Sequence, residues 1–177
     1  GSEMCIRDRC NPATLTEDKL RGYKTAGVNR LSIGAQSFDD DILANLGRLH
    51  RSADIIENFE TARQVGFDNI NLDLMFAVPG LVTKEWRRTV KKALSLKPEH
   101  LSFYSLEIAE GTVFDRMISD GKLKETPEDM DRRMYAACIE ELCRAGMVHY
   151  EISNAALPGR ECRHNLKYCC LLYTSDA

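Results

Sequence analysis

The stretch NINLDLMFAV, residues 69–78, carries the strongest indication of how this chain folds. Apolar and polar residues alternate along it and Pro79-Gly80 ends it, which predicts a β-strand. One face carries four apolar side chains and the other does not: Ile70, Leu72, Leu74 and Phe76 against Asn71, Asp73 and Met75. A carboxylate inside a buried strand is costly unless a partner meets it. Asp73 therefore indicates either an architectural pair or a ligand.

Two further predicted strands flank this one, and helical segments separate all three. The strands cover residues 29–37 and 100–108, and helices are expected from residue 16 to 26, from 52 to Gly66 and from 83 onward. Strands separated by helices of this length pair in parallel through right-handed crossovers. The pattern predicts an α/β fold, as an open sheet or a barrel, followed by a helix ending near residue 145 and a short strand at 149–153.

Composition narrows the class of protein. The chain has 177 residues, a net charge of −3, 44% hydrophobic and 29% charged residues, which fits roughly one globular domain. No apolar run approaches the ~18 residues of a membrane helix, and the mixed charges argue against a nucleic-acid partner held by phosphate contacts. We expect a cytoplasmic protein. The seven cysteines include no CxxC or CxxxCxxC spacing, so no metal ligands are assigned in this chain.

Polar residues also mark the carboxyl ends of the other predicted strands, where α/β sheets carry their sites. Gln36 lies at the carboxyl end of the strand at residues 29–37, and Arg48 lies in the short segment that follows this strand. Ser105 and Glu107 lie at the carboxyl end of the strand at residues 100–108. Arg48 offers a planar fork for a carboxylate or phosphate. A loop-anchoring glutamine and a solvated arginine are the structural alternatives. The residues alone indicate a polar ligand at the edge of the sheet formed by the carboxyl ends of its strands.

Four segments in series resemble the oxygen-independent coproporphyrinogen III oxidase-like group of radical SAM proteins: GVNRLSIGAQSF, LGRLH, NINLDLMFAVPG and PEHLSFYSLEIAEGT. The resemblance implies a partial (β/α) barrel of the radical SAM type, later half only, followed by a helical or α+β C-terminal extension. It also implies that Gln36, Arg48 and Asp73 contact S-adenosylmethionine. A 4Fe-4S cluster is implied for the full-length parent only.

The segment at residues 150–168 is similar to the heme-chaperone branch of that family. His164, Asn165 and Tyr168 match a motif linked there to heme binding, and Cys169 replaces its tryptophan. The resemblance implies heme and heme-accepting proteins as partners, and it allows peripheral membrane association of the parent. The alternative is a coproporphyrinogen III oxidase of porphyrin biosynthesis, which acts on propionate side chains.

The chain departs from the family at several places. Arg9-Cys10-Asn11-Pro12 lacks the acidic residue that the family has before this landmark, and Ala77-Val78 replaces Gly-Leu, a change expected to shift packing more than chemistry. We expect residues 1–9 and 169–177 to be a non-native leader and tail, 10–111 the partial barrel and 112–168 the start of the C-terminal region. No catalytic residue is assigned. An inactive half barrel is a third interpretation.

Overall fold

The computed structural model describes the backbone of residues 7–166, within which six strands form one sheet. The strands are β1 (Arg7–Cys10), β2 (Arg30–Gln36), β3 (Ile70–Phe76), β4 (His100–Ser105), β5 (Val148–Glu151) and β6 (Asn154–Ala156). Their order in the sheet is β1-β2-β3-β4-β6-β5. The first four pair in parallel, and β6 and β5 add an antiparallel hairpin beside β4. The sheet is open, as a partial barrel requires.

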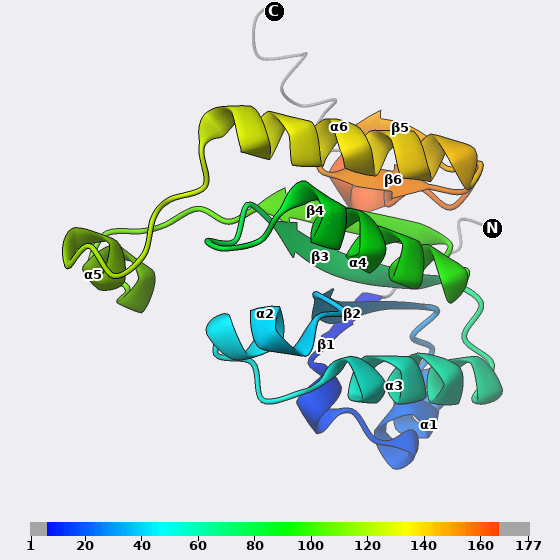
Figure 1. Cartoon of the computed structure of the whole chain (residues 1–177). Coiled ribbons are helices and arrows are strands. Elements are labelled where there is room, and N and C mark those ends of the chain that lie inside the picture. Colours follow the sequence, from blue (N-terminus) through cyan, green and yellow to red (C-terminus); the bar gives the residue numbers. More distant parts are fainter. Residues whose placement is uncertain (1–6, 167–177) are drawn as a thin grey trace, which may run out of the picture.

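The helices are a 3-10 turn at Pro12–Thr14, α1 (Glu17–Thr25), α2 (Asp40–Asn45), α3 (Ser52–Gln64), α4 (Thr83–Ser95), α5 (Val113–Ser119) and α6 (Glu128–Arg144). Helices α1 to α4 lie between successive parallel strands, α5 and α6 connect β4 to the hairpin, and apart from α5 the helices lie along one face of the sheet (Figure 1). Helix α5 stands away from the rest of the fold in Figure 1, and none of its residues is buried. No helix within the described part of the chain is long and apolar enough to cross a membrane.

The face of the sheet that the helices cover, here called the outer face, holds the hydrophobic core. Leu72 and Leu74 of β3 are fully buried there, as is Trp86 of α4. The Trp86 Nε1–H donates to the carbonyl of Met134 at 2.9 Å, which joins α4 to α6. Beside it, Arg87 forms ion pairs with two glutamates of α6. Burial of these side chains supplies the main drive for folding.

The structure confirms the predicted parallel strands and corrects the end of the chain. Residues 149–153 do not form one strand, because the chain turns there and β5 pairs back on the three-residue strand β6. Helix α5 and strand β1 were not anticipated. Residues 7–10 pair with β2, so the strand reaches into the segment 1–9; its non-native origin stays a prediction.

Candidate functional site

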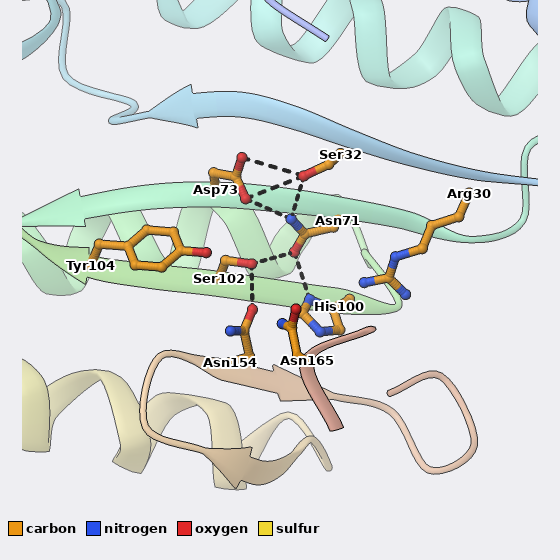
Figure 2. A pocket seen from close by; sticks show the side chains of 9 residues that line it. All are labelled: Arg30, Ser32, Asn71, Asp73, His100, Ser102, Tyr104, Asn154 and Asn165. Atoms are coloured by element: carbon orange, nitrogen blue, oxygen red, sulfur yellow. Dashed lines mark hydrogen bonds between the residues drawn. The ribbon is translucent and has the colours of Figure 1, made fainter. Parts of the chain in front are cut away.

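The face of the sheet opposite the helices, here called the inner face, carries a polar cavity of about 120 Å³. Nine side chains line it, all of them polar, and Figure 2 shows them: Arg30, Ser32, Asn71, Asp73, His100, Ser102, Tyr104, Asn154 and Asn165. They come from β2, β3, β4, β6 and the segment after β6. The period-two alternation of the strands places them on this face, because their apolar neighbours occupy the other.

Asp73 is nearly completely buried in the middle of this face and is held by two neighbours. The Ser32 hydroxyl lies 3.3 Å from both of its carboxylate oxygens, and Asn71 Nδ2 donates to Oδ1 at 2.7 Å. These bonds offset part of the cost of burying the charge. Asp73 is therefore fixed in place, and its position on the inner face agrees with the strand pattern of the sequence.

Asn71 connects Asp73 to the next strand. Its Oδ1 lies 2.6 Å from His100 Nδ1 and accepts from Ser102 Oγ at 3.1 Å. Ser102 Oγ also lies 2.6 Å from Asn154 Oδ1, so its single proton is shared between two amide oxygens and the same network reaches β6. These contacts join residues up to 52 positions apart in sequence. A buried network of this kind fixes one arrangement of the strands when all its members are satisfied.

The network continues from His100 into the C-terminal segment through Tyr150. The Tyr150 hydroxyl lies 2.7 Å from His100 Nε2, and it accepts from Cys162 N at 3.3 Å and from Asn165 Nδ2 at 3.4 Å. Burial raises the pKa of Tyr150 to about 12, so the hydroxyl keeps its proton at neutral pH. Residues 162–166 are thereby attached to the inner face through side-chain contacts.

Arg30 supplies a positive charge at the start of β2 and is almost fully buried. One terminal nitrogen donates to Asn69 Oδ1 and to the carbonyl of Arg160, each at 3.1 Å. Its Nε is buried and has no hydrogen-bond partner among the described residues. The buried Nε–H is therefore an unused donor beside the cavity, a position that accommodates water or a polar ligand group.

Gln36 lies at the carboxyl end of β2, where the strand is irregular. Ile33 pairs with Leu72 and Gln36 with Leu74, so β2 carries one extra residue. Gln36 has φ of 65°, in the left-handed region that favours glycine. A Cβ on Gly34 would lie 3.1 Å from Gln36 Nε2, so the glycine allows the amide to fold back over the strand. Bulges and strained residues of this type concentrate beside functional sites.

Arg48 is exposed in the loop between α2 and α3, and the loop is anchored at the end of β2. His50, two residues further on, is buried, with its Nε2 3.3 Å from the carbonyl of Ala35. The cavity lining includes Asp73 but, among the described residues, neither Gln36 nor Arg48. The structure thus places Gln36 and the Arg48 loop near one strand end and Asp73 deeper on the inner face. His50 is an anchor that sequence reasoning did not single out.

Ala77 follows β3 and replaces the glycine typical of the resembling family. It has φ of 55°, again in the left-handed region, and it is buried. Glycine adopts that conformation without steric cost, whereas alanine does not. The substitution therefore also affects backbone conformation, and the expectation that it shifts packing more than chemistry stays a prediction.

The three residues predicted to bind heme do not share one environment in the structure. His164 is exposed on a helical turn at residues 163–166, and Asn165 points into the cavity lining. Tyr168 lies outside the described residues. The described cysteines do not gather, and no group of three His, Cys, Asp or Glu side chains within residues 7–166 could hold a metal ion. This part of the chain therefore does not fit a 4Fe-4S cluster.

An open βα sheet with a polar inner face is the architecture of radical SAM proteins, and comparison with known proteins agrees. Residues 3–93, just over half of the chain, match the Radical SAM superfamily. The chain belongs to that superfamily. The coproporphyrinogen III oxidase HemN of Escherichia coli, a radical SAM enzyme, superposes with a TM-score of 0.79 over 90% of this chain and 36% of its own. At 23% identity this likeness concerns the fold alone.

Two relatives indicate which branch of the superfamily this chain resembles. The heme chaperone HemW of Bacillus subtilis is 44% identical over 167 residues, which is 94% of this chain and 44% of that protein. The heme chaperone HemW of Escherichia coli is 36% identical over 165 residues, or 92% of this chain and 42% of that protein. The chain thus spans less than half the length of these relatives. These matches confirm the resemblance to the radical SAM family that the sequence motifs indicate.

Proposed function

We propose that this chain is part of a cytoplasmic radical SAM heme chaperone, which binds heme and transfers it to acceptor proteins. The similarity to heme chaperones over nine-tenths of the chain supports the class. The observation that carries the assignment is the attachment of residues 162–166 to the inner face through Tyr150. It brings the segment that bears His164 to the same face as Asp73.

In this proposal three residues contact S-adenosylmethionine. The exposed guanidinium of Arg48 pairs with the methionine carboxylate in a bidentate manner. The buried carboxylate of Asp73 and the amide of Gln36 accept from amino or hydroxyl groups of the ligand. When bound, S-adenosylmethionine would supply the radical chemistry for which the superfamily is named. The residues of this chain bind and orient the cofactor.

The imidazole of His164 is the proposed axial ligand of heme iron, as is common for neutral histidine. It is exposed, so a planar macrocycle can approach it without rearrangement of the core. Asn165 is the neighbour that faces inward, and Tyr168 completes the proposed heme set. Heme and heme-accepting proteins are the proposed partners.

Heme titration of the full-length protein, followed by the absorbance of the heme band, tests this function. We expect saturable one-to-one binding whose spectrum changes in His164→Ala. His149→Ala is the matched control, because His149 lies on β5, outside the proposed segment, and this variant should retain the wild-type spectrum. Identical spectra for wild type and His164→Ala would remove His164 as the ligand. Conversion of coproporphyrinogen propionates by the same preparation would favour the oxidase instead.

A further inference from the structure

We propose that Tyr150 is the positioning residue that holds the segment carrying His164 in its outward orientation. This inference rests on the proposed function, since it concerns the proposed heme segment, residues 162–166. It assigns a role to a side chain that is neither a heme ligand nor a contact of S-adenosylmethionine. The Tyr150 hydroxyl contacts both the inner-face network and the heme segment.

The direction of each hydrogen bond at Tyr150 follows from its neighbours. The Asn71 amide nitrogen donates to Ser32 and Asp73, so Asn71 presents its oxygen to His100. In the tautomer that carries its proton on Nδ1, His100 donates to Asn71 and its Nε2 is the acceptor. The Tyr150 hydroxyl donates to that nitrogen at 2.7 Å. The orientation of Tyr150 is thus set by the inner-face network.

The two lone pairs of the Tyr150 oxygen are then used by the C-terminal segment. They accept from the backbone N–H of Cys162 at 3.3 Å and from Nδ2 of Asn165 at 3.4 Å. A phenolic oxygen has one proton to give and two lone pairs, so all its capacity is used. One hydroxyl therefore joins the segment to the sheet both at its start and within the helical turn.

The fixed position of Asn165 determines where its neighbour points. Consecutive residues of a helical turn are rotated by roughly 100° from each other, so Asn165 facing the cavity leaves His164 facing outward. The structure agrees, because Asn165 lines the cavity and is partly buried whereas His164 is exposed. Release of Asn165 would allow the turn to rotate and would lower the fraction of time that His164 is presented.

A second tyrosine and histidine pair in the same region provides a matched control. The Tyr135 hydroxyl of α6 lies 3.2 Å from His149 Nε2 and donates to the carbonyl of Ile152 at 2.8 Å. It is partly buried and packs on the aromatic ring of Phe103. Its hydrogen bonds go to the β5–β6 hairpin and not to residues 162–166. Its loss should affect stability without affecting the heme segment.

The test compares Tyr150→Phe with Tyr135→Phe in the full-length protein. The first readout is amide hydrogen exchange of residues 162–166 without heme, and the second is heme affinity. We expect exchange to become at least about tenfold faster and heme binding at least about tenfold weaker, as order-of-magnitude effects, because Tyr150→Phe loses both hydrogen bonds to the segment. Tyr135→Phe should match the wild type in both. A stability effect alone would lower the unfolding midpoint of both variants without separating them in heme affinity.

Unchanged exchange or unchanged heme affinity in Tyr150→Phe would overturn the proposal. If His164→Ala still binds heme as the wild type does, the proposed ligand fails, while the exchange measurement still decides whether Tyr150 holds the segment. If Tyr150→Phe does not fold, Asn165→Ala removes one of the two contacts between Tyr150 and the segment and leaves the bond from Cys162 N in place. Faster exchange of residues 163–166 is expected in that variant, and wild-type exchange there would contradict the role of Tyr150.

Discussion

The two faces of the sheet are built on different physical principles. The outer face is apolar, and its residues are held by burial against α3, α4 and α6, with Trp86 fully enclosed. The inner face is polar, and hydrogen bonds from Asp73 through Asn71 and His100 to Tyr150 hold it. Burial of apolar area is non-directional, whereas a hydrogen-bond network depends on each donor and acceptor. The outer face therefore stabilises the fold, and in the proposed function the inner face positions groups for binding.

The comparison predicts that the largest loss of stability comes from the outer face. Trp86→Ala removes a buried indole and its bond to Met134 and should lower the free energy of unfolding by about 3–5 kcal/mol. Trp86→Phe keeps most of the packing and should cost less. Urea denaturation of the full-length protein measures both. A small loss for Trp86→Ala would mean that the outer face does not dominate stability.

The inner face should give an intermediate loss at its most connected member. Asn71→Ala removes the partner of Ser32, Asp73 and His100 together, so we expect about 2–3 kcal/mol less stability. Met75→Leu, on the same strand, changes shape but breaks no hydrogen bond, and should cost under about 1.5 kcal/mol. Equal losses in the two variants, measured by the same denaturation, would show that the network contributes little.

The strand ends should separate binding from stability. Arg48→Gln removes an exposed charge, so the free energy of unfolding should change by less than about 0.5 kcal/mol. Affinity for S-adenosylmethionine, measured by calorimetry on the full-length protein, should fall about tenfold, or about 1.4 kcal/mol, through loss of the carboxylate pair. Arg51→Gln, also exposed and three residues away, serves as the control. Equal affinities of the two variants would remove Arg48 from the site.

The smallest predicted effect concerns acid stability at the start of α2. The backbone N–H of Ser52, 2.8 Å from Asp40 Oδ1, holds the pKa of Asp40 below its ordinary value. A carboxyl with a lowered folded-state pKa stabilises the protein above its unfolded pKa, near 3.8, and this contribution is lost as pH falls through the folded pKa. Asp40→Asn should therefore lower stability slightly at neutral pH and match the wild type in strong acid. A constant difference across acid titration of the unfolding midpoint would contradict this assignment.

The parallel core of the fold was predictable because its signals are local. Alternation along residues 69–78 and the separating helices identify β3 and its neighbours. Strand β1 was not predicted because the sequence Arg7–Cys10 has no apolar alternation, and its pairing with β2 uses backbone groups. Strand β6 has three residues, too few for a period to show.

The site was predictable one residue at a time and not as a network. Asp73 was found because a carboxylate in an apolar strand is conspicuous. His100 and Tyr150 were not, since their contact joins positions 50 residues apart and neither is unusual in its own strand. The bulge at Gln36 also has no local signal, because it depends on the register of β2 against β3. The features that the sequence did not reveal are therefore those that depend on contacts between residues far apart in the chain.

Hydrogen exchange of the full-length protein with and without S-adenosylmethionine tests the central claim most directly. If the inner face and its strand ends form the binding region, added ligand should slow exchange in residues 34–37, 47–50 and 76–78, at the ends of β2 and β3 and in the Arg48 loop. The amides of α1 and α5 should exchange as before. Protection confined to those two helices, with none at the three strand-end segments, would contradict the account.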